Sequence, residues 1–87
     1  MNITPSQALA RLSDFSKRVD RLEANQYSNP RFRVADLNRL KASQRGFIFL
    51  CSIGVHNRNK ERATEIISVA KEKFSLAKEK YFYGNVC

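Results

Sequence analysis

An apolar side chain recurs every three or four residues through the first quarter of the chain, with charged residues between. This spacing follows the 3.6-residue turn of an α-helix and not the two-residue alternation of a strand. Ahead of it, Thr4, Pro5 and Gln7 have the order of an N-cap, a first helical residue and the second half of a capping box. The pattern predicts a helix over residues 5–24. Its apolar stripe comprises Ala8, Leu12, Phe15, Val19 and Leu22.

Two later segments carry the same periodicity and predict helices over residues 31–54 and 59–82. The 87 residues include only three Gly and two Pro, too few turn formers for a β-fold of this length. We therefore expect an all-α protein in which residues 1–87 form a single domain, an antiparallel three-helix bundle. The two further stripes are Leu37, Leu40, Gln44, Phe47, Ile48, Cys51 and Val55, and Ala63, Ile66, Ile67, Ala70, Phe74, Ala77 and Tyr81.

The middle helix has two features that the pattern leaves open. It begins either at the Asn29-Pro30 pair or after Val34, and Gly46 marks either close packing or a bend. From Phe47 onward the segment is apolar nearly all round, so it needs cover on more than one side. Homodimerisation would supply that cover.

The last helix contains a short repeat. Ala70-Lys71-Glu72-Lys73-Phe74 returns seven residues later as Ala77-Lys78-Glu79-Lys80-Tyr81, so the same helix face is restated every two turns. The aromatic residues at 82 and 83 lie off the stripe and either cap the bundle or meet a partner. Gly84 is a candidate helix cap, and residues 84–87 are expected to be a flexible tail.

Positive charge is concentrated in the middle of the chain. Sixteen Lys and Arg against eight Asp and Glu give a net charge of +8, and residues 31–56 hold five cations against Asp36 alone. Such a segment predicts a surface that faces an anion, with Phe32 either stacking on a base, filling a partner's pocket or lying in the core. The predicted contact residues are Arg31, Arg33, Arg39, Lys41 and Arg45, with Lys17, Arg18 and Arg21 beside them.

Two functions fit this surface. The first is a binding protein that engages nucleic acid or a nucleoprotein complex, mainly through phosphate contacts. The second is a protein-binding regulator or inhibitor, of the type that phages and mobile elements encode, occupying an acidic or nucleic-acid-binding groove of a host nucleic-acid-processing enzyme. Mimicry of DNA is excluded, because a DNA mimic is acidic.

Catalytic chemistry finds little support in the sequence. His56 is the only histidine, and Cys51 lies in an apolar segment, where its thiol is expected to have a raised pKa and low reactivity. We expect no enzyme activity, no catalytic residue, no metal and no cofactor. The longest apolar run is about half of a membrane span, and Cys51 and Cys87 do not form a disulfide framework. These features predict a protein of the reducing cytoplasm without a membrane partner.

Overall fold

The computed structural model describes residues 3–82, and no strand occurs among them. The all-α prediction is confirmed, but the helices number more than the three expected. They are α1 (Pro5–Ala24), α2 (Pro30–Ser43), α3 (Phe47–Gly54) and α4 (Lys60–Ala77), followed by a π-helical turn, η1 (Lys78–Phe82). The predicted tail at residues 84–87, with Gly84 and Cys87, lies outside the described residues.

Helix α1 begins and ends where its sequence predicts. Thr4 accepts a hydrogen bond from the Gln7 backbone N–H, and the Gln7 side chain accepts one from Thr4, which completes the capping box. The helix ends at Asn25, whose φ of 52° is the left-handed conformation that Asn tolerates. Both signals are local, which is why they can be read from the sequence.

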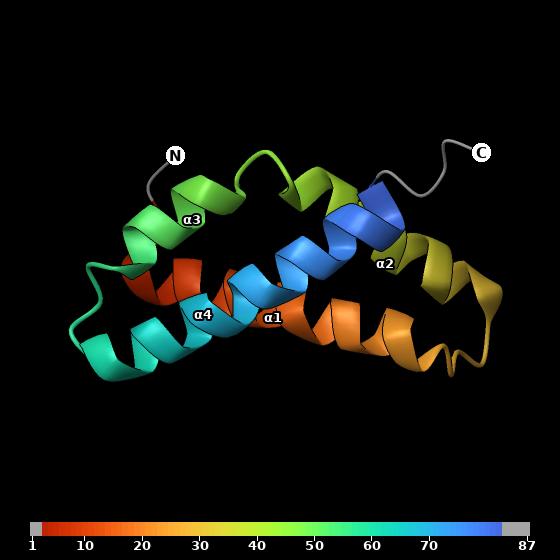
Figure 1. Ribbon diagram of the computed structural model, residues 1–87, viewed down its shortest axis with the longest axis horizontal. Helices are drawn as coiled ribbons and strands as arrows, with labels where there is room; N and C mark the ends of the chain where they lie inside the picture. The colour runs from red at the N-terminus through yellow and green to blue at the C-terminus, as the bar shows by residue number, and fades with distance from the viewer. Residues whose placement is uncertain (1–2, 83–87) are drawn as a thin grey trace.

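The other three helices all pack on α1, which is the centre of the fold (Figure 1). Its apolar stripe is buried together with side chains from α2, α3 and α4. Three rings form the middle of this core: Phe47 stacks on Phe74 with centroids 4.2 Å apart, and Phe15 lies 5.3 Å from Phe47. The core therefore joins α1, α3 and α4 in one cluster.

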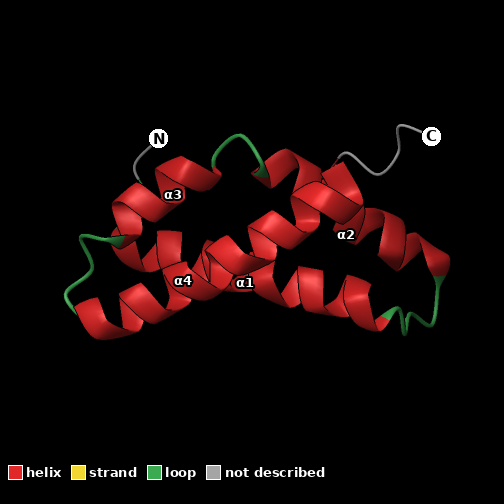
Figure 2. Ribbon diagram, in the orientation of Figure 1, coloured by secondary structure: helices red, strands yellow, loops and turns green. Residues whose placement is uncertain are grey.

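The helix expected over residues 31–54 is wrong, because the chain breaks at residues 44–46 into α2 and α3 (Figure 2). The N–H groups of Gln44 and Gly46 bond to carbonyls three residues back, at 3.3 and 3.2 Å, which ends the α-helical ladder. The Ser43 hydroxyl also donates to the Arg39 carbonyl at 2.8 Å, a contact that bends helices. The break lets α2 and α3 pack separately on α1.

The open question at the start of α2 is also settled. Asn29 is the N-cap, and its side-chain oxygen accepts from the Arg31 N–H at 3.0 Å, with Pro30 as the first helical residue.

The seven-residue repeat places its lysines in two different roles. Lys73 and Lys80 bind α1 carboxylates, Asp20 at 2.6 Å and Glu23 at 2.9 Å, and tie the last helix to the first. Tyr81 also donates to Glu23, and its burial, then this bond, raise the pKa of Tyr81 to about 12. Hydrogen bonds, first from Lys80 and then from Tyr81, lower the pKa of Glu23.

The off-stripe aromatic residue within the described range acts as a cap. Phe82 is half-buried and meets the edge of Phe74 at a centroid distance of 5.7 Å. Its neighbour Tyr83 lies outside the described residues.

Two glycines at the ends of α3 give a matched test of this packing. A Cβ at Gly54 would lie 3.0 Å from Leu9 and 3.3 Å from Ile67, both buried, whereas one at Gly46 meets nothing within 4 Å. We expect Gly46→Ala to raise the free energy of unfolding by about 0.5 kcal/mol. The free energy of unfolding of Gly54→Ala should be about 1 kcal/mol lower than that of Gly46→Ala, because core side chains must move to make room for the new Cβ. Urea denaturation checks both, and equal gains would contradict the close packing at Gly54.

Candidate nucleic-acid interface

Helix α2 is held to the fold by very few buried groups. Only Asp36 and Leu40 are buried along its 14 residues, with Leu37 packed partly against the core. The Asp36 carboxylate accepts from Arg18 Nη1 at 2.6 Å, from Arg21 Nε at 3.1 Å and from the Tyr27 hydroxyl at 2.7 Å. This cluster, the Asp36 cluster, fixes α2 beside α1.

The Asp36 cluster perturbs the pKa values of its members. Burial by itself raises the pKa of Asp36, but the bonds from Arg21, Tyr27 and Arg18 outweigh it and leave that pKa below its ordinary value. The hydrogen bond to Asp36 raises the pKa of Arg21, and burial followed by the same carboxylate raises the pKa of Tyr27. The carboxylate is therefore ionised in the folded protein.

Because Asp36 is bound by α1 guanidiniums, the cations of α2 have no carboxylate of their own. Among residues 3–82 the ion pairs within 4 Å use Asp14, Asp20, Glu23 and Asp36, and none involves an α2 cation. All five cations predicted between residues 31 and 45 are exposed. The structure thus leaves this part of the surface positively charged and uncompensated.

The five cations do not share one face of α2. At about 100° per residue, Arg31 lies opposite buried Leu40, on the side away from the core, and Arg45 follows in the turn. Arg39 lies on one flank of the helix, and Lys41 lies on the other. Arg33 lies on the same side as Leu40 but nearer the start of the helix, toward η1, where its charge opposes the rise in the Tyr81 pKa. The cations therefore surround the exposed part of the helix.

The three α1 cations predicted to lie beside these residues have two different roles. Arg18 and Arg21 are indeed adjacent to α2, but both hold Asp36, and the Arg18 side chain is only 21% exposed. Lys17 is exposed on α1. Arg18 and Arg21 thus act first as positioning residues for α2.

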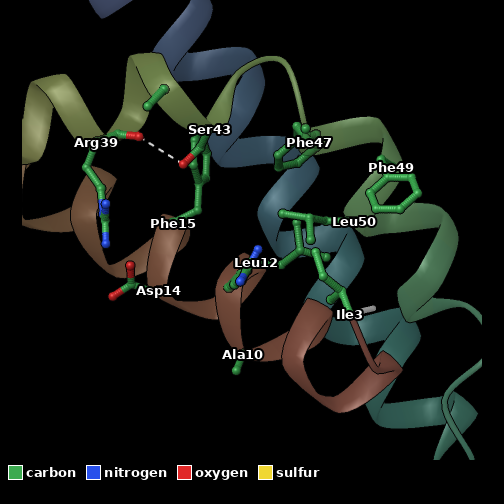
Figure 3. Close-up of a pocket in the computed structure, with 13 residues that line it drawn as sticks. Ile3, Ala10, Leu12, Asp14, Phe15, Arg39, Ser43, Phe47, Phe49 and Leu50 are labelled. Atoms are coloured by element: carbon green, nitrogen blue, oxygen red, sulfur yellow. Dashed lines mark hydrogen bonds between the residues drawn. The ribbon is translucent and has the colours of Figure 1, made fainter. Parts of the chain in front are cut away.

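A hollow of about 570 Å³ lies next to Arg39, between α1, the end of α2 and the start of α3. Figure 3 shows Arg39 extending toward Asp14, with Phe49 at the far side above Leu50. Arg11 also lines the hollow, and Phe49 is 56% exposed. Sequence reasoning missed Arg11 and Phe49, because only the packing of α2 and α3 on α1 brings them near Arg39.

Phe32 is not a core residue, since 58% of its surface is exposed. It precedes Arg39 by seven residues and so lies on the same side of α2. Cation and ring thus share the flank that leads to the hollow.

The residues considered for catalysis remain apart from this surface. His56 is exposed after α3, while Cys51 is buried, and burial raises the pKa of its thiol. Within residues 3–82 no three His, Cys, Asp or Glu side chains gather where a metal ion would bind. No described helix is long and apolar enough to cross a membrane.

Comparison of the chain with protein families, curated proteins and solved structures gave no match. We therefore infer the function from the surface itself.

Replacing Asp36 tests its role in docking α2. We expect Asp36→Asn to lower the free energy of unfolding at pH 7 by about 2 kcal/mol, because two guanidiniums and a hydroxyl lose their shared acceptor. Since the folded pKa of Asp36 is depressed, its contribution is present above the ordinary value of 3.8 and is lost as pH falls below it. The difference between wild type and variant should shrink over that range.

Chemical denaturation from pH 7 to pH 3 measures this dependence. Asp20→Asn is the control, since its exposed bond to Lys73 should contribute less than about 1 kcal/mol. A difference between wild type and Asp36→Asn that does not depend on pH would contradict the assignment.

Proposed function

We propose that this chain is a non-enzymatic binding protein that engages nucleic acid through the exposed cations of α2 and the turn after it. The observation that carries the proposal is that α2 and this turn present five cations, while the one carboxylate of α2 is buried against α1. Among residues 3–82 no carboxylate forms an ion pair with them within 4 Å. An external polyanion would supply the missing negative charge.

Phosphate contacts are the chemistry that this arrangement favours. Four of the five cations are Arg, whose planar fork matches phosphate oxygens. From Arg31 to Lys41 the helix rises about 15 Å, a length over which duplex DNA presents roughly nine negative charges. Cations on both flanks of one helix suit a backbone that passes on either side of it. Binding of this kind is mainly independent of sequence.

Removing the four arginines of α2 and the turn after it tests the proposal directly; this variant is called the α2 variant. We expect the quadruple variant Arg31→Ala, Arg33→Ala, Arg39→Ala, Arg45→Ala to bind a labelled duplex about 100-fold more weakly at low salt. Wild-type affinity should fall roughly 500-fold between 50 and 200 mM salt if all five cations contact phosphate, and the slope of log K against log salt should become shallower by roughly 3 to 4 in the variant. Fluorescence anisotropy measures both quantities.

The matched control removes four positive charges from elsewhere, through Arg58→Ala, Lys60→Ala, Arg62→Ala and Lys71→Ala. If both variants weaken binding equally, net charge and not α2 is responsible. If wild type binds no nucleic acid, and a protein is retained from nuclease-treated lysate by wild type but not by the α2 variant, the cations face an acidic protein groove and the proposal fails.

Phe32 gives a second, independent measurement. Stacking on a base contributes about 1–3 kcal/mol, so Phe32→Ala should weaken binding to single strands by roughly 5- to 150-fold and affect a duplex much less. Val34→Ala is the control, because Val34 is similarly exposed on α2 but offers no ring. Equal losses of affinity for single strands and for a duplex would show that Phe32 does not stack on a base.

A further inference from the structure

Helix α3 leaves an apolar surface uncovered. It carries no charged residue, and while Phe47, Leu50 and Cys51 face the core, Ile48 is 78% exposed and Val55 is 58% exposed. In a chain this small, apolar side chains exposed in a row mark a surface that another molecule covers.

These exposed side chains form one wall of a groove between α3 and α4. Its volume is about 560 Å³, and the α4 wall is built by Ile67 and Phe74. The polar lining is confined to Ser52, Ser75 and Lys71. The groove thus has an apolar floor along both helices.

The only charged residue among the described residues that line the groove is Lys71. Lys71 faces Cys51 closely enough that its charge opposes the burial-driven rise in the Cys51 pKa. Lys78 lies over the Phe74 ring, 5.7 Å from its centroid. The repeat explains this division, because Lys73 and Lys80 bind α1 carboxylates while Lys71 and Lys78 form no ion pair among residues 3–82.

We propose that the α3–α4 groove is a docking site for an acidic amphipathic helix of a partner protein. The apolar face of such a helix would cover Ile48 and Val55, and carboxylates along its edge would meet Lys71 and Lys78. A second copy of this chain is the poorer occupant, because it would bring another net charge of +8 and two more lysines to the same border. The proposal is independent of nucleic-acid binding by α2, which uses other residues.

The experiment selects peptides from a random library, so that the charge and spacing of the bound peptides are not fixed in advance. Displayed random peptides of about 16 residues, long enough for about four helical turns, are selected on the wild-type chain and counter-selected on the double variant Ile48→Asp, Val55→Asp. Circular dichroism and denaturation establish that the double variant folds. We expect the enriched peptides to repeat apolar residues at helical spacing with Asp or Glu beside them.

The charge of the border is then tested with the best peptide. The pair Lys71→Glu, Lys78→Glu should weaken its binding at least 10-fold, and a peptide with its acids changed to Lys should restore it. The pair Lys41→Glu, Lys60→Glu makes the same change in charge away from the groove and should have little effect. The quadruple α2 variant should bind the peptide as wild type does.

Several outcomes would overturn the proposal. They are no enrichment, enriched peptides without acidic residues, or equal losses in the two lysine pairs. Sedimentation velocity supplies one more: a wild-type dimer that the Ile48→Asp, Val55→Asp variant abolishes would make a second copy the occupant. A monomer at all concentrations supports a partner of different sequence.

Discussion

The attachment of α2 to α1 through the Asp36 cluster is the interaction on which the rest of the account depends. A helix that buries only two side chains has little hydrophobic stabilisation, so the bonds from Arg18, Arg21 and Tyr27 carry much of its docking. The same bonds place the only carboxylate of α2 inside the protein. One contact therefore both positions the helix and leaves its outer cations without a partner.

The parts of this fold that the sequence predicts are those set by local chemistry. The bounds of α1 follow from its capping box and apolar stripe, and the start of α4 is within a residue of the expected one. Gly46 allowed a bend or close packing, and the structure has a break there with open space around Gly46. The sequence did not decide between the two, because Leu40 and Phe47 keep a helical spacing across the break. What separates the two helices is their independent packing on α1, which no single segment encodes.

The candidate site, too, could be predicted from the sequence only in part. The sequence shows the concentration of cations between residues 31 and 45, and it also led to the prediction that Arg18 and Arg21 lie beside them. The role of Asp36 is not, because a lone acid among arginines looks like diluted charge until its burial is known. The two lysine roles in the repeat likewise require the position of α1, since only some of the lysines reach Asp20 and Glu23.

The proposed function requires that α2 presents its cations outward while Arg18 and Arg21 stay on Asp36. Nuclear magnetic resonance of the arginine Nε–H groups during titration with a short nucleic-acid duplex tests it most directly. We expect the resonances of Arg31, Arg39 and Arg45 to move on binding, while those of Arg18 and Arg21 keep their free-state positions. Shifts confined to Arg58 and Arg62 of the α4 end, or a release of Arg18 and Arg21 from Asp36, would contradict it.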